Sequence, residues 1–367
     1  MINILINSGK SFFSLRKSFV EYLLHHQHSI RILTPNNKLQ IKKNFPSNRV
    51  KIELYKLYNN KKSTITLIKN IFSLFYIFKG YKQNTNIIFG SYLILIFGVI
   101  SFLIPFKKNI YVFTGLGSYF NYQNKLNIFL VKLIFNIILT KKNSFFVFYN
   151  SADRNFLINK KLYNKSKIIM GSGIDIKRKV FKKKIKKKKN FLYYFSFNSD
   201  KGLLDLIKAI DIVNSSRFGK KCKFFFYGLF DENPSKISRK FLKKKISKFK
   251  NVFLKETEYE KNLDNIFLRK HVFILPSHRE GLPKSVLEAM NFNCALILSN
   301  IPGHKFLINR KKVNGLYFET KNEIDLSKKI IWMIQNKNKI TEYSQNSKKN
   351  LSKFSSNKVN KLLYETI

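Results

Sequence analysis

Residues 272–290 read VFILPSHREGLPKSVLEAM, an apolar run followed by a short loop and then a helical pattern. The run from Val272 to Leu275 predicts a buried strand whose carboxyl end delivers Glu280 into the loop. Pro283 suits the first position of a helix, and the free amides and dipole of a helix start favour a phosphate or another anion. Glu288 lies about one and a half turns into that helix, so both carboxylates can face the same ligand.

The two carboxylates at this spacing have two interpretations. Ionised carboxylates accept hydrogen bonds from hydroxyl groups, so the pair suits a sugar and a ribose. On their own, the two residues would also fit surface charges on a capped helix. The residues that follow favour the ligand site, because Asn293 can end the helix in the left-handed conformation and an apolar strand, Ala295 to Leu298, comes directly after it.

The alternation of short apolar strands with helical patterns extends outward from this stretch, which indicates parallel βαβ units. In the C-terminal half we predict a helix at 203–213 and strands at 191–197, 223–227, 252–254, 272–275 and 295–298. In the N-terminal half we predict helices at 19–25 and 127–139 and strands at 2–6, 30–34, 87–89, 110–113 and 145–149. Both halves are therefore predicted to be doubly wound α/β domains.

A run of lysines separates the two halves. Residues 177–190 are too self-repelling to pack, so we interpret them as an interdomain linker. The predicted organisation is an N-terminal domain at 1–176, this linker, a C-terminal domain at 191–345 and a helical segment at 346–367. Two such domains facing each other would form a cleft at the carboxyl ends of their strands, where ligands usually bind.

The composition is strongly basic. The 367 residues include 70 Lys and Arg against 20 Asp and Glu, a formal charge of +50. Lys, Asn, Ile and Phe are all abundant together, which favours drift under AT-rich codons as the main cause. An anionic membrane surface is the second interpretation, and it is compatible with drift. Nucleic-acid binding is the third, but no helix-turn-helix or aromatic platform supports it.

The remaining composition favours the cytoplasm. Cys222 and Cys294 lie in apolar contexts without metal spacing, so neither a disulfide framework nor a zinc site is predicted. Residues 1–7 lack a basic n-region and a small-residue cleavage site, and we interpret them as a first strand rather than a signal peptide.

Residues 87–106 form a stretch of 20 residues without a charge, which matches the length of a membrane span. Gly90 and Ser91 near its start and Pro105 near its end favour the alternative, a buried strand, a turn and an apolar helix that packs in the fold or dips into the membrane.

The stretch from Pro276 to Met290 resembles the E-x7-E signature of family-4 retaining glycosyltransferases. Five further stretches resemble that family in the same order: Thr114-Gly115-Leu116-Gly117-Ser118, Gly171-Ser172-Gly173-Ile174-Asp175, Asp200-Lys201-Gly202, Ile301-Pro302-Gly303 and Asn314-Gly315. The subgroup that it resembles most comprises the N-acetylgalactosaminyltransferases that extend diphospho-undecaprenol-linked sugars.

The resemblance implies a GT-B fold, in which two Rossmann-like domains face each other across a cleft. The C-terminal domain would bind a UDP-sugar and the N-terminal domain a lipid-linked glycan acceptor, with retention at the anomeric carbon. No metal cofactor is expected, and none of the eight Asp residues forms an Asp-x-Asp pair. The enzyme would lie on the inner face of the cell membrane, against anionic lipid.

The resemblance also implies roles for individual residues. Glu280 would hold the sugar hydroxyls, Glu288 the ribose and Lys201 the diphosphate. Backbone groups of Gly281, Leu282 and Pro283 would contact sugar and phosphate. In the N-terminal half, the turns that contain Gly9, Gly115 and Gly117 would face the acceptor.

One position departs from the family's pattern. Ser196 stands where the family has a second diphosphate residue, an arginine, and serine cannot make the bidentate phosphate contact. An alternative function is therefore a catalytically impaired relative that binds sugar nucleotides. No general base is identified, and a metal cluster at His25, His26 and His28 is less favoured than a partly exposed helix end.

Overall fold

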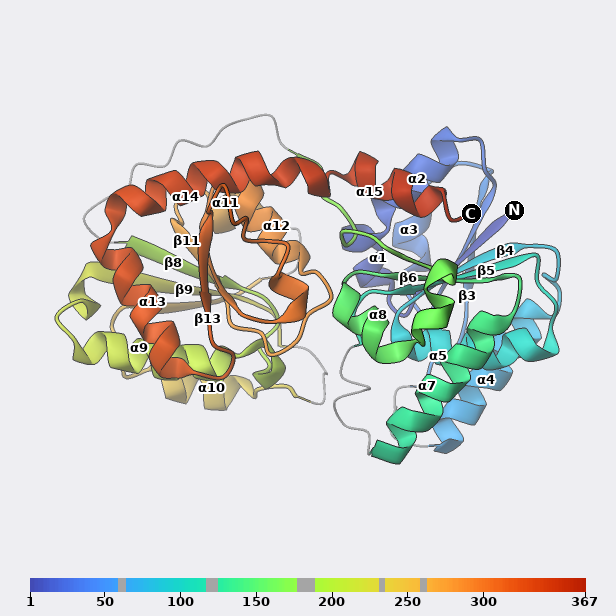
Figure 1. Cartoon of the computed structure of the whole chain (residues 1–367), viewed down its shortest axis with the longest axis horizontal. Helices are drawn as coiled ribbons and strands as arrows, with labels where there is room; N and C mark the ends of the chain where they lie inside the picture. The colour runs from blue at the N-terminus through green and yellow to red at the C-terminus, as the bar shows by residue number, and fades with distance from the viewer. Residues whose placement is uncertain (59–63, 117–124, 177–188, 231–234, 258–262) are drawn as a thin grey trace. The chain divides into compact units, whose positions relative to one another are not determined.

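The computed structural model describes residues 1–58, 64–116, 125–176, 189–230, 235–257 and 263–367. The chain divides into two compact units. Unit 1 comprises Met1–Gly173 together with Ser356–Ile367, and unit 2 comprises Ile174–Ser355. Each unit is built around its own parallel sheet (Figure 1).

The sheet of unit 1 has seven strands in the order β3-β2-β1-β4-β5-β6-β7 among the described residues, all parallel. The strands are β1 (Ile2–Leu5), β2 (Ile30–Thr34), β3 (Val50–Leu54), β4 (Thr85–Phe89), β5 (Lys108–Phe113), β6 (Ser144–Phe148) and β7 (Ser166–Ile168). The central strands β1, β4 and β5 are buried on both faces, as their unbroken apolar runs predict. The reversal of strand order beside β1 confirms the doubly wound topology.

Helices cover both faces of this sheet (Figure 1). On one face lie α4 (Thr64–Phe78), α5 (Ser91–Leu103) and α7 (Lys125–Thr140), whose aromatic side chains pack with Tyr111, Phe113 and Phe146 of the strands. On the other lie α1 (Gly9–Leu15), α2 (Lys17–His25), α3 (Lys38–Asn44) and α15 (Ser356–Tyr364). The short helix α8 (Ser151–Leu157) follows β6.

Unit 2 repeats the plan with six parallel strands in the order β10-β9-β8-β11-β12-β13 among the described residues. The strands are β8 (Lys189–Tyr194), β9 (Cys222–Gly228), β10 (Val252–Glu256), β11 (Val272–Leu275), β12 (Ala295–Ser299) and β13 (Gly315–Phe318). The helices are α9 (Leu203–Ser215), α10 (Arg239–Ile246), α11 (Leu263–Phe267), α12 (Lys284–Asn291), α13 (Glu323–Gln335) and α14 (Lys337–Asn350). The second doubly wound domain is thus confirmed.

The uncharged stretch at 87–106 folds as a strand, a turn and a helix. β4 ends at Phe89, Gly90 turns the chain with φ +96°, and α5 follows with most of its residues buried. Gly98 lies so close to Ile138 of α7 that an added Cβ would collide with it. In the part of the chain that the structure describes, we find no helix that combines the length and the apolar character of a membrane span.

The two ends of unit 2 differ from the predicted boundaries. β8 begins at Lys189, so the last two residues of the predicted linker belong to a strand, while 177–188 lie outside the described residues. The predicted segment at 346–367 is shared, because α14 packs in unit 2 and α15 packs on unit 1. Asn360 of α15 donates to the carbonyl oxygen of Ser18 at 3.0 Å, which ties the helix to α2.

Candidate functional site

The loop between β11 and α12 carries the first predicted site residue, Glu280. β11 is buried throughout, and its chain leaves the sheet at Pro276. Pro283 is the N-cap of α12, so the helix begins at Lys284, one residue later than predicted. Proline still suits this position, because its missing N–H is one that a helix start leaves unpaired.

Glu280 and Lys201 lie together. Lys201 Nζ is 2.7 Å from Glu280 Oε1, and Ser277 Oγ donates to the same oxygen at 2.8 Å. The side chains are only 18% and 10% exposed, so water screens the pair weakly. Lys201 Nζ also lies 4.2 Å from the centre of the Phe195 ring. Two residues 79 positions apart thus form one charged site.

Close backbone packing holds the three loops of this site against one another. Gly202 follows Lys201 with φ +66°, and an added Cβ would collide with the carbonyl of Pro276. Gly303, after β12, lies against the carbonyl of Glu280 in the same way. Only glycine permits these approaches, so the Asp200-Lys201-Gly202 and Ile301-Pro302-Gly303 motifs position the loop that carries Glu280.

His304 is a buried residue of this site that the sequence analysis missed. Its side chain is fully buried, its Nδ1–H donates to the carbonyl oxygen of Ser299 at 2.8 Å, and its Nε2 has no hydrogen-bonding partner among the described residues. Burial lowers the pKa of His304 to about 4, although Glu280 nearby opposes the shift. The ring is therefore neutral at pH 7. Its only signal in the sequence is its place directly after the Ile301-Pro302-Gly303 motif.

His304 and Glu280 are also linked through hydroxyl groups. Ser299 Oγ donates to the carbonyl oxygen of Ser277 at 2.5 Å, and Ser277 in turn donates to Glu280. The chain of contacts orients the carboxylate from the ends of two adjacent strands, β11 and β12. His278 in the same loop lies 2.7 Å from Asp205 Oδ2 of α9, a second contact that the sequence analysis did not identify.

Glu288 lies in α12 and is 6% exposed. Its Oε1 is 3.9 Å from Lys284 Nζ, one turn earlier in the helix. Gly281, Leu282 and Pro283 are buried and lead from Glu280 to the helix start. The structure therefore places these five predicted residues on one loop and the first two turns of one helix.

Ser196 follows β8 and is 9% exposed. Its carbonyl oxygen accepts from Tyr193 Oη at 2.8 Å and from the Asn198 backbone N–H at 3.0 Å. Asn198 then caps the short helical turn that carries Lys201, with its Oδ1 accepting from the Lys201 backbone N–H at 3.0 Å. The serine thus belongs to the turn that presents Lys201, and it brings no positive charge.

Comparison with known proteins identifies unit 2. Residues 175–350 match the family described as glycosyl transferases group 1. Unit 2 is a group 1 glycosyltransferase domain. The predicted resemblance to glycosyltransferases is confirmed, and the charged site just described lies inside this domain.

One relative of the glycosyltransferase covers nearly the whole chain. The N,N'-diacetylbacillosaminyl-diphospho-undecaprenol alpha-1,3-N-acetylgalactosaminyltransferase of Campylobacter jejuni is 27% identical over 354 residues, which cover 91% of this chain and 89% of that protein. By its name, this relative belongs to the subgroup that the sequence motifs resemble, the N-acetylgalactosaminyltransferases that extend diphospho-undecaprenol-linked sugars.

Solved structures share the fold at low sequence identity. The sucrose-phosphate synthase of Thermosynechococcus elongatus aligns with a TM-score of 0.76 at 12% identity, covering 99% of this chain and 97% of that chain. Anabaena HepE in complex with UDP-glucose aligns with a TM-score of 0.73 at 14% identity, covering 100% and 98%. These similarities confirm the predicted GT-B fold class with two Rossmann-like domains.

The predicted acceptor-side residues of the glycosyltransferase lie in unit 1. Gly9 begins α1, and its backbone N–H donates to Asn36 Oδ1 at 2.8 Å. Gly115 follows β5 with φ +130°, a conformation that favours glycine. Gly117 lies outside the described residues. Both described glycines stand after carboxyl ends of strands, the edge where α/β domains bind ligands.

Arg16 is a buried cation of unit 1 that the sequence analysis missed. Its guanidinium lies 3.8 Å from the centre of the Phe89 ring, and its Nη1 donates to Tyr149 Oη at 3.0 Å and Ser172 Oγ at 2.9 Å. The residue therefore joins the ends of β4 and β6 to the Gly171-Ser172-Gly173 motif. A lone arginine beside a lysine gave no sign of this role.

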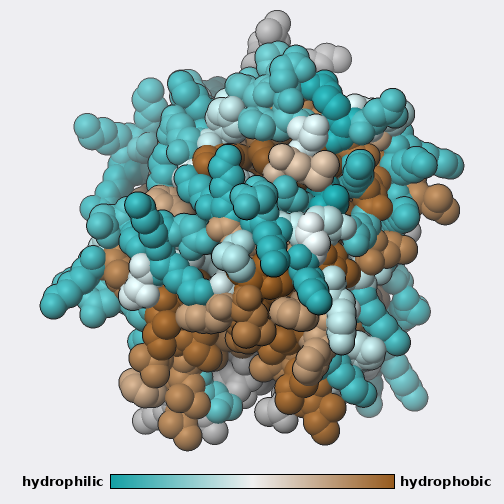
Figure 2. Space-filling model, turned by 90° about the vertical axis from the view of Figure 1, so that its right-hand side faces the viewer, coloured by the Kyte–Doolittle hydropathy of each residue, from teal (hydrophilic) through white to brown (hydrophobic). Residues whose placement is uncertain are grey.

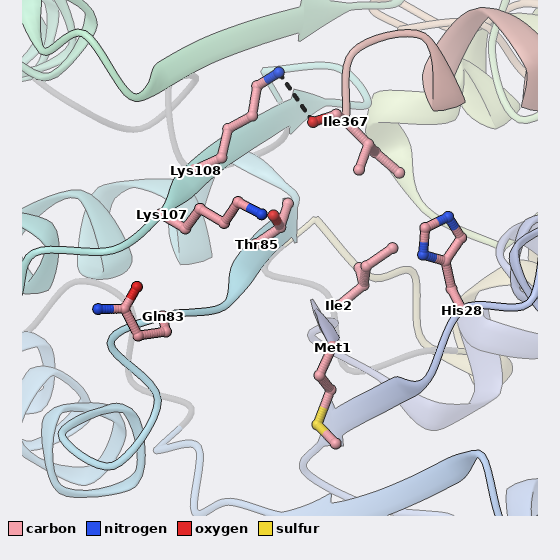
Figure 3. A pocket seen from close by; sticks show the side chains of 8 residues that line it. All are labelled: Met1, Ile2, His28, Gln83, Thr85, Lys107, Lys108 and Ile367. Atoms are coloured by element: carbon pink, nitrogen blue, oxygen red, sulfur yellow. Dashed lines mark hydrogen bonds between the residues drawn. The ribbon is translucent and has the colours of Figure 1, made fainter.

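The remaining candidates of unit 1 have ordinary contacts. His26 stacks on Tyr22, and His28 Nε2 lies 3.1 Å from Tyr364 Oη, so both histidines pack against the α2–α15 contact. A hollow of about 260 Å³ lies beside His28 at the amino ends of β1, β4 and β5 (Figure 3). There Lys108 Nζ donates to the Ile367 oxygen at 3.1 Å. This is the sheet edge opposite to the one where such domains bind ligands, and we assign no ligand to it.

Proposed function

We propose that the glycosyltransferase transfers a hexose or N-acetylhexosamine from a UDP-sugar to a lipid-linked, undecaprenyl-type glycan acceptor with retention. The observation that carries the proposal is the Lys201–Glu280 pair at the carboxyl ends of the unit 2 strands, directly before the start of α12. The relative from Campylobacter jejuni, by its name, acts on a diphospho-undecaprenol-linked acceptor. Anabaena HepE was solved with UDP-glucose.

In this proposal each residue of the site meets a different part of the donor. Glu280 accepts hydrogen bonds from the sugar hydroxyls, and Glu288 accepts them from the ribose. The diphosphate competes with Glu280 for Lys201, and it also faces the backbone amides at the start of α12. When the bond from the anomeric carbon to UDP breaks, Lys201 stabilises the negative charge that develops on the leaving diphosphate.

The acceptor places the reaction at a membrane. An undecaprenyl chain stays in the bilayer, so the enzyme must reach its head group from the surface. The charge of +50 attracts the protein to anionic lipid, each Lys or Arg near the surface contributing about 1 kcal/mol. We therefore propose that the protein is peripheral on the membrane, in the biosynthesis of a surface glycan.

Ser196 favours a second candidate, a relative that binds sugar nucleotides and turns them over poorly. The buried serine brings no guanidinium to the diphosphate, and one lost charge-assisted contact costs about 1.5–3 kcal/mol. Under this alternative Lys201 is the main cation of the site, and its charge is already compensated by Glu280.

Release of UDP distinguishes the two candidates. The wild-type protein is incubated with a panel of UDP-sugars and a lipid-linked diphosphate acceptor, beside Glu280→Gln and Glu288→Gln. Glu342→Gln is the matched control, because Glu342 is an exposed glutamate of the same unit, 2.8 Å from Lys339. We expect acceptor-dependent UDP release that falls about 100-fold or more in the two site variants and is unchanged in the control.

Other outcomes would overturn one or both candidates. UDP-sugar binding by calorimetry without release supports the impaired relative, and neither binding nor release contradicts both. Release that survives Glu280→Gln would show that the donor lies elsewhere. We also propose that no divalent cation is needed, so the rate should persist in a chelator such as EDTA.

A further inference from the structure

Two helices of unit 1 are apolar on both faces. Towards the sheet, Leu74 and Phe78 of α4 and Phe135 and Ile138 of α7 are fully buried. Such burial is ordinary for helices that cover a sheet. A helix that is apolar on its outer face as well is typical of a membrane or a second interface.

The outer faces of α4 and α7 carry large apolar side chains that are between 44% and 73% exposed. They recur at helical spacing: Ile65, Ile68, Phe72 and Tyr76 on α4, and Leu126, Phe129, Leu130, Leu133 and Ile137 on α7. α5 packs against both helices and adds the exposed pair Phe102 and Leu103 at its end. We call these eleven residues the α4–α7 apolar surface. Figure 2 shows apolar side chains gathered in the lower part of the molecule. The helices α4 and α7 lie in the lower part of unit 1 in Figure 1.

The charged residues on these helices are lysines. α4, α5 and α7 contain no Asp or Glu. Lys69 lies on α4, and Lys79 and Lys142 follow the ends of α4 and α7, all three exposed. Lys141 Nζ lies 3.9 Å from the centre of the Phe102 ring and donates to the Ser101 carbonyl at 2.6 Å. The surface thus combines an apolar centre with basic residues at its edge.

This combination selects among possible occupants. A second copy would bring like charges together, and nucleic acid would leave the aliphatic centre without a partner. A bilayer of anionic lipid satisfies both parts, because acyl chains receive the apolar side chains while lysines extend to the head groups.

We propose that the α4–α7 apolar surface inserts into the interfacial region of an anionic bilayer and holds unit 1 there. The inference deepens the proposed function, since a lipid-linked acceptor requires a protein at the membrane. The surface is distinct from the uncharged stretch at 87–106, because α5 packs most of its side chains into the core and only its end is exposed.

Vesicle binding tests the proposal directly. The full chain is sedimented with vesicles of equal parts phosphatidylglycerol and phosphatidylcholine, beside the double variant Phe72→Ser, Phe129→Ser. Leu39→Ser is the control, because Leu39 is 79% exposed in the same unit but lies on α3. We expect the partition coefficient to fall at least tenfold in the double variant and to stay unchanged in the control. Lys79→Gln, Lys142→Gln should lower it about fivefold for each lysine, on anionic vesicles only.

A fluorescent label reports insertion without relying on loss of binding. Both native cysteines are buried, so Phe129→Cys offers one accessible thiol for an environment-sensitive probe among the described residues. The probe at 129 should shift to shorter wavelength on vesicles and be quenched by brominated acyl chains, whereas a probe from Leu39→Cys should not. An unquenched probe at 129, or unchanged binding of the double variant, would overturn the proposal.

Two further measurements separate the alternatives. Self-association that disappears in the double variant while vesicle binding persists would assign the surface to a second copy and overturn the proposal. UDP release with a water-soluble, short-chain acceptor should remain unchanged in the double variant. If that release is absent in the wild type while vesicle binding behaves as expected, the proposed function fails and the membrane surface stands.

Discussion

Replacing Lys201 and Glu280 singly and together separates the stability that their contact provides from the role in donor binding that we propose for it. At 2.7 Å and an effective dielectric constant of about 20, the attraction between the two charges is about 6 kcal/mol. Desolvation offsets much of it, because the side chains are 18% and 10% exposed. We therefore expect Lys201→Met and Glu280→Gln each to lower the free energy of unfolding by about 2–3 kcal/mol.

The double variant should recover part of this loss. Each single variant leaves one partly buried charge without its partner, whereas the double variant leaves none, so the two losses should fall short of additivity by about 1–3 kcal/mol. Activity should behave differently. If both residues contact the donor, UDP release should fall about 100-fold to 1,000-fold in each single variant and should not recover in the double variant.

The assay can follow the unit that contains the site. Trp332 is the one tryptophan of the chain and lies in α13 of unit 2, so its fluorescence during urea unfolding reports on this unit. The control is the exposed pair Lys339 and Glu342, at 2.8 Å with both side chains about half exposed, for which coupling should stay below about 1 kcal/mol. Additive losses at the site would refute the coupling argument. Recovered activity in the double variant would show that the pair supports the fold and does not bind the donor.

Three further predictions concern the same unit. Burial lowers the pKa of His304 from 6.5 to about 4, so between pH 6.5 and about 4 the unfolded state binds more protons than the folded state. The free energy of unfolding should therefore fall by up to about 3 kcal/mol as the pH drops from 6.5 to about 4. His304→Asn should flatten this dependence in urea titrations at pH 7.5 and pH 5, and an unchanged slope would contradict the assignment. Gly303→Ala should displace the carbonyl of Glu280 and weaken UDP binding at least tenfold by calorimetry, whereas wild-type affinity would contradict the packing argument. Ser196→Arg should lower the KM for the donor about tenfold, and an unchanged KM would show that a missing arginine does not limit binding.

Much of unit 2 could be predicted from the sequence because its signals are local. β11 and β12 are buried on both faces and appear as unbroken apolar runs. Glu280 and Glu288 lie in the loop and the helix that follow β11. β3 was missed because it is an edge strand with half-exposed residues, so Val50–Leu54 shows no apolar run. β13 was missed for a similar reason, since it lies at the other sheet's edge and its two central residues are half-buried.

The contacts that complete the site could not be predicted, because they join distant parts of the chain. Nothing in the sequence near Lys201 indicates that its ammonium meets Glu280, 79 residues later. His304 and Arg16 gave even less signal, since one histidine or one arginine is common at a surface. Only the fold shows that both side chains are buried at the carboxyl ends of strands.

Hydropathy alone does not locate the membrane surface that we propose. Residues 87–106 form an uncharged run of spanning length, yet that run supplies β4 and the core helix α5, packed between α4 and α7. The exposed apolar residues come from α4 and α7, each of which contains a lysine and is less continuously apolar. Hydropathy measures how apolar a segment is, whereas docking depends on which side chains the fold leaves uncovered. In a doubly wound domain the most apolar helix is the one most completely covered by its neighbours, so a proposed membrane contact is better sought on the flanking helices.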